Sequence, residues 1–436
     1  MADMKIAFTW IFLQSMCVVY AYIYLENGEI DYECSMVSAS AASRRFSYSL
    51  YKTAAKLSGH RRNIFLPPLA VGMSLSSLTY GAYGWSRVQI FRVLEQRNKS
   101  EEAMDEDCIL HAYHSDRYNR QFVLEDFEEE NDTAVLRTAT RLYGDKTFTF
   151  RDDFVQSTGR YGIEMAVAPF NESRKLAERQ INRWVNEQTG GNIVNIIQPN
   201  FLTPDAMLVI TCALFFKGTW DISFVNEGIG PFYLYRKRYR EIEFMASRDP
   251  VRYLSSNILQ AELLELPYTS PDGSNIDARL IVILPRSNVS IRTTEDALND
   301  TVIQALLQQD LSMDIRIHIP KFSLFGEHKL KFFLKRMGVR EIFHGKKSRL
   351  YGAVSEEDEK RRIHVTHIQH KAKFEIDEFG TQGSVTRLDP RKDHVANATQ
   401  EWDFRVDRPF LFLIYDKFTD TIIYIGRLAD PERRVT

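Results

Sequence analysis

The C-terminal stretch "FRVDRPFLFLIYDKFTDTIIYIGRLADP", residues 404–431, contains two apolar runs that flank a short polar segment. The first run, "RPFLFLIYD", and the second, "TIIYIGRL", are rich in the aromatic and β-branched residues that favour strands. The polar segment between them is short enough to act as a turn. The sequence therefore predicts that the chain ends in a pair of strands.

The chain upstream divides into a helix-rich first half and a strand-rich second half. Helical spacing of apolar residues occurs in 40–58, and Ser173 can cap a helix over "SRKLAERQINRWVNEQTGG". The run "AMLVITCALFFKG" (206–218) predicts a strand buried on both faces, and "LQAELLELPY", "ARLIVILP" and "DIRIHIPKFSL" predict further strands. We expect an α+β fold with large sheets in one domain, because no linker rich in Pro, Gly or Ser divides the chain.

Residues 98–133 interrupt this pattern. They are charged and acidic, with "FEEEND" at 127–132. Such a composition offers little apolar surface to bury. We therefore predict that 98–133 is an acidic insertion on the surface.

The overall composition is that of a globular protein, with 44% apolar and 26% charged residues among 436. The net charge of −2 gives no reason to expect nucleic acid as a partner. Short basic runs at 235–241 ("YRKRYRE") and 359–364 ("EKRRIH") are expected to be solvated faces. Nucleic-acid or heparin binding is the alternative for these runs.

The first residues have the character of a secretory leader. Lys5 precedes an apolar run from Ile6, and Ala21 is a small residue suited to a cleavage site, so 1–21 is predicted to be a signal peptide. The alternative is a membrane anchor, but Gln14 and Ser15 interrupt the run. We expect a secreted, extracellular monomer with no membrane association after signal cleavage.

Sequons and cysteines fit a secreted protein. Six N-x-S/T patterns predict N-glycosylation, and they start at Asn98, Asn131, Asn171, Asn288, Asn299 and Asn397. After cleavage the chain would keep Cys34, Cys108 and Cys212. Their wide spacing is neither a disulfide framework nor a zinc pattern, and which pair could bond is left open.

A search for catalytic motifs finds none. The sequence has no G-x-S-x-G, H-E-x-x-H, Walker loop or paired C-x-x-C, and its ten histidines have no metal-ligand spacing. We predict that the protein is not an enzyme and uses neither a cofactor nor a metal.

Four blocks, in one order, resemble the serpin family. They are "INRWVNEQTGGNIVNII" (181–197), "LFFKGTWDISF" (214–224), "HKAKFEIDEFGT" (370–381) and 404–431. The resemblance implies a serpin domain over 40–436, with three β-sheets, about nine helices and an exposed reactive-centre loop, here 378–403. In inhibitory members a serine protease attacks this loop and forms an acyl-enzyme. The loop then inserts as a new central strand and distorts the protease.

The resemblance also assigns roles to individual residues. The hinge of the loop comprises Glu378, Gly380, Thr381, Gly383 and Val385. Lys321 matches the ion-pair partner of Glu378 at the mouth of the sheet. Counting from Gly380 puts the nominal scissile bond between His394 and Val395, and Arg391 and Lys392 are the basic cleavage candidates.

The loop departs from what insertion requires. If Thr381 points inward, alternation also points Gly383, Val385, Arg387, Asp389, Arg391 and Asp393 inward. The last four are charged, and burying an unpaired ion costs several kcal/mol. Pro390 also removes a backbone donor.

The region where the sheet opens departs as well. The family places two serines here, but Pro67 and Ala70 occupy their positions, and Cys212 replaces an asparagine. His370 alone is expected to remain of a hydrogen-bonded group, unless it is an ordinary core histidine.

Two functions follow from these features. We expect a secreted serpin that meets extracellular serine proteases but inserts its loop poorly, and so is non-inhibitory or a substrate. The alternative is a functional covalent inhibitor of a trypsin-like serine endopeptidase.

Overall fold

A computed structural model describes residues 36–96, 106–113, 135–235, 238–269, 277–309, 311–381 and 403–431. The α-helices among these residues are α2 (Met36–Ser58), α3 (Pro68–Leu78), α4 (Gly84–Glu95), α5 (Glu106–His111), α7 (Asp152–Gly159), α8 (Arg174–Gln188), α9 (Ile291–Ala297), α10 (Asp300–Leu307) and α11 (Leu330–Met337). Three short 3-10 helices follow α11, namely η2 (Glu341–Phe343), η3 (Tyr351–Ala353) and η4 (Glu359–Arg361).

The strands form three sheets. They are β1 (Ile64–Leu66), β2 (Val135–Asp145), β3 (Glu164–Ala168), β4 (Leu208–Thr219), β5 (Val225–Tyr233), β6 (Tyr239–Ser247), β7 (Val251–Ser256), β8 (Ala261–Pro267), β9 (Ala278–Pro285), β10 (Ser312–Met313), β11 (Arg316–Pro320), β12 (Phe322–Gly326), β13 (Val365–Ile376), β14 (Gly380–Thr381), β15 (Asp403–Arg405), β16 (Phe410–Asp416) and β17 (Thr421–Leu428).

The six-stranded sheet has the order β12-β13-β4-β2-β3, and the short strand β14 pairs with β4. The seven-stranded sheet has the order β1-β17-β16-β9-β8-β7-β10, and the four-stranded sheet β15-β11-β6-β5. This arrangement confirms the α+β class and the three sheets predicted from the resemblance, and the described residues contain nine α-helices.

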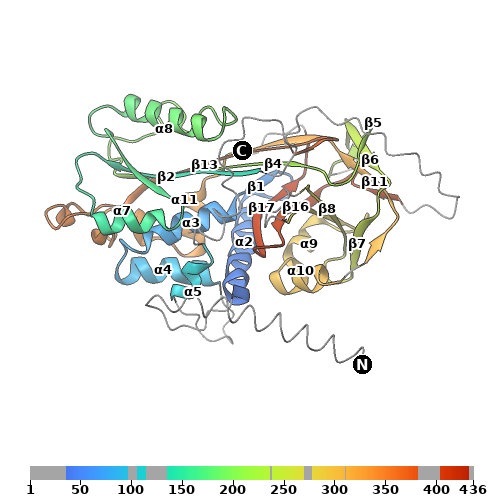
Figure 1. Ribbon diagram of the computed structural model, residues 1–436, viewed down its shortest axis with the longest axis horizontal. Coiled ribbons are helices and arrows are strands. Elements are labelled where there is room, and N and C mark those ends of the chain that lie inside the picture. Colours follow the sequence, from blue (N-terminus) through green and yellow to red (C-terminus); the bar gives the residue numbers. More distant parts are fainter. Residues whose placement is uncertain are drawn as a thin grey trace, which may run out of the picture.

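Strand β4 separates two cores. Leu208, Ile210, Cys212, Leu214 and Phe216 belong to the main core. The alternate residues Val209 and Ala213 belong to a smaller core that contains Ala177, Ile181 and Val185 of α8. Helix α8 lies on one side of the long strands β2, β13 and β4, and α3 lies on the other (Figure 1). The period of two along a strand thus assigns the even-numbered positions of β4 to the main core.

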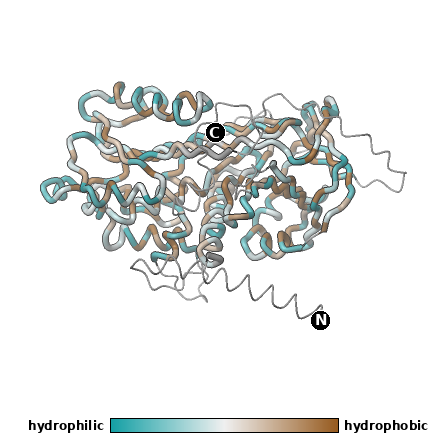
Figure 2. The backbone as a smooth tube through the Cα atoms, viewed as in Figure 1, coloured by the Kyte–Doolittle hydropathy of each residue, from teal (hydrophilic) through white to brown (hydrophobic). Residues whose placement is uncertain are grey.

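The C-terminal strand pair lies inside the seven-stranded sheet, next to its edge strand β1. Strand β16 pairs with β17 and with β9, and every residue of β16 and β17 is buried. Gly426 of β17 lies against the ring of Phe412 and the backbone of Ile64. Hydrophobic segments gather in this part of the molecule, and the helix α8 carries many hydrophilic residues (Figure 2).

The structure differs from the sequence prediction in the acidic segment. Within 98–133, residues 106–113 contain α5, and Cys108, Ile109, Leu110 and Tyr113 are buried. The Tyr113 ring packs edge-on against Phe46 of α2 at 6.3 Å between ring centroids. The prediction of a surface insertion is therefore wrong for this part, because a short apolar group inside a charged segment reaches the core.

A second difference concerns "DIRIHIPKFSL". Its alternation predicts strand structure, and the structure divides the stretch into β11 and β12, which belong to different sheets. Lys321 lies at the junction between them, and its N–H donates to the Glu243 carbonyl of β6 at 2.8 Å. The apolar positions are odd-numbered up to Ile319 and even-numbered from Phe322, so the alternation shifts its phase at the residue where the chain passes from one sheet to the other.

Candidate functional site

The chain reverses direction directly after β13. The N–H of Asp377 donates to the Gly380 carbonyl at 3.0 Å, and the Asp377 carboxylate accepts from the Phe379 and Gly380 N–H groups. Gly380 has a φ of 143°, and an added Cβ would collide with the Gly218 carbonyl oxygen. Glycine is therefore needed at this turn, both for its backbone angle and for the close approach.

After this turn, β14 pairs antiparallel with the end of β4. Gly380 is the partner of Thr219, and Thr381 is the partner of Gly218. The Thr381 side chain is fully buried, and its Oγ1 lies 2.7 Å from the hydroxyl of Tyr268. The beginning of the predicted loop is thus already a strand of the six-stranded sheet.

An aromatic pair, Trp220 and Tyr268, packs beside the turn, and Trp220 forms hydrogen bonds with it. The Trp220 ring stacks on Tyr268 at 4.6 Å between centroids, and its Nε1–H donates to the Asp377 carbonyl at 2.9 Å. The Trp220 N–H donates to the Phe379 carbonyl at 3.3 Å. These contacts hold both ends of the reversal against β4.

Lys321 connects the hinge to two sheets. Its Nζ lies 3.1 Å from Glu378 and 2.7 Å from Glu243 of β6. Burial opposes the charged form of this lysine, but the hydrogen bonds with Glu243 and Glu378 outweigh it and raise the pKa of Lys321. The structure therefore places Lys321 and Glu378 in an ion pair, with Glu243 as a third member that the sequence did not indicate.

A buried polar cluster lies under the junction of β4 and β13. The Sγ of Cys212 is 3.2 Å from the Oγ of Ser74, and that hydroxyl donates to the Ala70 carbonyl at 2.8 Å. Because the serine hydroxyl is used in this way, the Cys212 thiol is the donor to Ser74. Burial raises the pKa of Cys212 to about 12, so the thiol is neutral at physiological pH.

Two histidines complete this cluster, and both contact the backbone of Phe65 in β1. His370 has its Nδ1 3.4 Å from the Cys212 carbonyl and its Nε2 3.4 Å from the Phe65 carbonyl. His328 accepts from the Phe65 N–H at 3.2 Å, and the two rings stack at 6.2 Å between centroids. Burial lowers the pKa of His328 to about 3 and that of His370 to about 4, so both are neutral.

Pro67 and Ala70 lie at the start of α3 and are buried. Neither contributes a polar side chain, as the sequence indicated, but Ser74 lies one turn beyond Ala70 and contacts Cys212. Ser74 and His328, which the sequence did not single out, join His370 and Cys212 in this polar cluster, and the expectation about the family's own hydrogen-bonded group stays a prediction. Residues four apart lie on the same face of a helix, so Ser74 faces the same way as Ala70, and this spacing could have indicated the contact of Ser74 with Cys212.

Several predicted residues lie outside the described part of the chain. They are the signal peptide 1–21, Cys34, Asn98, Asn131, Gly383, Val385, Arg391, Lys392, His394, Val395 and Asn397. Among the described sequons, Asn171, Asn288 and Asn299 are exposed, and Asn299 caps α10 by accepting from the Val302 N–H. Cys108 is disulfide-bonded, and Cys212 is a free thiol.

Among the described residues, no group of three or more His, Cys, Asp or Glu side chains is placed to hold a metal ion. None of the helices described here is both long and apolar enough to cross a membrane.

Comparison with known proteins agrees with this architecture. The leukocyte elastase inhibitor of Sus scrofa is 28% identical over 405 residues, which cover 91% of this chain and all of the relative. The solved structure of Serpin48 from the insect Tenebrio molitor superimposes with a TM-score of 0.73 at 22% identity, covering 92% of this chain and all of that one. Uncleaved ovalbumin gives a TM-score of 0.74 at 23% identity, over 90% of this chain and all of its own. The sequence model of the family described as "Serpin (serine protease inhibitor)" matches residues 41–431, and the chain belongs to this family.

Proposed function

We propose that this protein is a secreted serpin whose reactive loop is cut by extracellular serine proteases as a substrate, because the loop inserts poorly into the six-stranded sheet. Inhibition by a family member requires that the cleaved loop become a strand between β4 and β13. The proposal therefore depends on what the loop would meet along β4.

The register of β14 on β4 carries the proposal. Thr381 opposes Gly218, so a strand that continued in this register would place Arg387 opposite Cys212. Asp389 would then oppose Ile210, and these β4 residues face the main core. Two residues of opposite charge would have to enter a buried apolar layer.

The environment at Cys212 makes Arg387 the loop residue whose burial on insertion would cost the most free energy. His370 is the current partner of Cys212 in β13, and the cluster around it offers the neutral groups Ser74, His328 and His370. An arginine cannot lose its charge in a protein, and an unpaired buried ion costs several kcal/mol. Pro390 would cost about 3 kcal/mol more, by analogy with its effect in other regular structure.

The alternative, a covalent inhibitor of a trypsin-like protease, is favoured by one observation. Gly380 and Thr381 already occupy the first positions of the inserted strand, and Thr381 is bonded to Tyr268. Insertion would therefore begin without having to open the top of the sheet. The two functions differ only in whether the strand can grow past Val385.

Secretion is supported by three features of the chain. The N-terminal sequence resembles a leader, the described sequons are exposed, and Cys108 forms a disulfide, which is typical of oxidising compartments.

Incubation of the purified full chain with trypsin, followed by denaturing electrophoresis, tests the proposal. We expect a nicked chain and free active protease. A covalent complex that survives denaturation, at near one protease per serpin, would instead establish the inhibitor.

A further inference from the structure

A polar cavity of about 660 Å³ lies at the opposite end of β13 from the hinge, between η2, η3 and η4. Four cationic side chains line it, namely Lys346, Lys347, Arg349 and Arg362, against two carboxylates, Glu341 and Glu359. All four cationic residues are exposed to solvent. The cavity volume is within the range typical of small-molecule sites.

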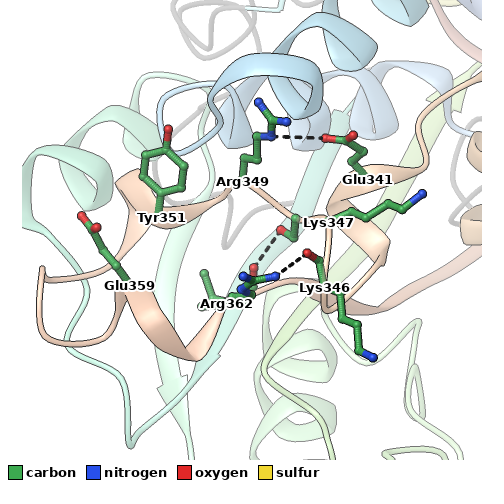
Figure 3. A pocket seen from close by; sticks show the side chains of 9 residues that line it. Glu341, Lys346, Lys347, Arg349, Tyr351, Glu359 and Arg362 are labelled. Carbon is green, nitrogen blue, oxygen red and sulfur yellow. Dashed lines mark hydrogen bonds and ion pairs between the residues drawn. The ribbon is translucent and has the colours of Figure 1, made fainter.

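Most of this positive charge is not neutralised within the protein. Lys346, Lys347 and Arg362 form no ion pair with any residue that the structure describes, and Arg349 is 3.9 Å from Glu341 at the edge of ion-pair distance (Figure 3). Glu341 is also an acceptor for the Ser86 hydroxyl at 3.3 Å. Like charges gathered at one concave surface raise each other's energy, and a bound anion would relieve this repulsion.

The backbone of Arg362 gives an independent indication of a built site. This residue ends η4 in the left-handed region, with φ 52° and ψ 63°, where glycine or asparagine is normally favoured. Its Nη1 donates to the Lys346 carbonyl at 2.7 Å and so links the two sides of the cavity (Figure 3). Strained residues of this kind concentrate at functional sites.

An aromatic side chain also lines the cavity. Tyr351 is exposed, and its ring stacks on Tyr83 at 4.7 Å between centroids and 10° between planes. This stack gives the cavity a rigid apolar edge beside the cations. Such an edge suits a ligand that has a ring as well as charges.

We propose that this cavity binds a compact polyanion, a small molecule that bears at least two sulfate or phosphate ester groups. Guanidinium groups match the planar oxygen pairs of such esters, and the two lysines act as mobile point charges. A single anionic group would be disfavoured by Glu341 and Glu359, whereas a ligand with several anionic groups could contact more than one of the cations. This site goes beyond the proposed function and does not depend on whether the loop inserts.

Calorimetric titration of the full chain with inorganic tripolyphosphate and with a fully sulfated disaccharide tests the proposal. We expect saturable one-to-one binding that weakens as salt is raised, because the contacts are ionic. Binding of tripolyphosphate alone assigns ligands with phosphate groups, binding of the disaccharide alone assigns sulfated sugars, and binding of both assigns the general class. Absence of binding by both probes at low salt overturns the proposal.

Two variants and one control locate the site. The double change Lys346→Glu and Lys347→Glu should weaken binding at least about tenfold, because two attractive charges become repulsive. Lys175→Glu makes the same kind of change on the exposed face of α8 and should leave binding unchanged. If the Lys175 variant loses affinity as much as the double variant does, binding is a property of net charge and the proposed site is wrong.

Arg362→Gly separates binding from folding. Glycine suits the left-handed backbone at this position, so the unfolding temperature should stay within about 2 °C of the parent. Affinity for the probe should nevertheless fall several-fold, because a guanidinium group is lost from the cavity. Unchanged affinity in this variant would contradict the proposed role of Arg362.

Discussion

Thr381 is the antiparallel partner of Gly218, and its hydroxyl lies 2.7 Å from that of Tyr268 in a fully buried site. This relationship fixes which loop residues would face the main core if the strand were to grow. It also shows that Gly380 and Thr381 already pair with β4 in the intact chain.

The Thr381–Tyr268 hydrogen bond should contribute measurably to stability. Tyr268→Phe leaves the buried Thr381 hydroxyl without this partner and should lower the free energy of unfolding by about 1–3 kcal/mol. Thr381→Val leaves the Tyr268 hydroxyl without its partner and should lower the free energy of unfolding by a similar amount. Combining both changes should cost less than the sum of the single costs, as urea unfolding can measure. Strictly additive costs would mean that the two hydroxyls do not interact.

The paired histidines should make the fold sensitive to acid. Their folded pKa values, about 4 for His370 and about 3 for His328, lie below the value of 6.5 expected in the unfolded chain. Below pH 6.5 the unfolded state binds more protons than the folded state, so stability is lost as pH falls. Each histidine should contribute a loss of about 1.4 kcal/mol per pH unit until its folded pKa is reached.

His328→Asn is the matched variant for this measurement. The asparagine oxygen can accept from the Phe65 N–H and does not titrate, so this variant should lose less stability between pH 6.5 and 4. Urea unfolding at several pH values compares the two proteins, and both retain His364 and His367, whose pKa values burial also lowers. An identical pH dependence would show that His328 is not buried as a neutral ring.

Trypsin should cut the loop early. Arg391 and Lys392 are the basic residues of the loop nearest the nominal bond, whereas His394, directly before that bond, suits few proteases. Mass spectrometry of the nicked chain should find the new end after Arg391 or Lys392. A dominant cut at Val395 or beyond would contradict this and would leave more loop available for insertion.

The predicted α+β class followed from features that are local in sequence, whereas the number of sheets came from the resemblance to the family. Alternation and apolar runs identify strands, and β16 and β17 are buried throughout, as such runs favour. The contribution of α5 to the core was missed because the charge of 98–133 was judged as an average, which hid Ile109 and Tyr113.

Only part of the candidate site could be predicted from the sequence. Lys321 and Glu378 came from resemblance, but Glu243 joins them through the pairing of β11 with β6, which no local pattern encodes. His328 was missed for the same reason, since its partner Phe65 is 263 positions away in the sequence. The register of β14 on β4 could likewise be learned only from the structure.

Replacing two of the inward-facing charged residues of the loop should allow the cleaved loop to insert between β4 and β13. Arg387→Thr and Asp389→Leu remove the two ions that would oppose Cys212 and Ile210, and Pro390→Glu restores a backbone donor. After cleavage in the loop, the triple variant should melt well above the cleaved parent, because the loop can now add a strand. If both cleaved proteins melt alike, the obstacle lies instead at the changed positions Pro67, Ala70 and Cys212, where the sheet opens.

The melting temperature of the parent before and after loop cleavage tests the central claim most directly. A loop that inserts adds a strand to the six-stranded sheet, and the cleaved protein then becomes much harder to unfold. Because continuation of β14 would bury Arg387 beside Cys212, we predict that cleavage leaves the melting temperature within a few degrees of the intact value. A rise of tens of degrees after cleavage would show that the charged loop does insert, and it would contradict the account.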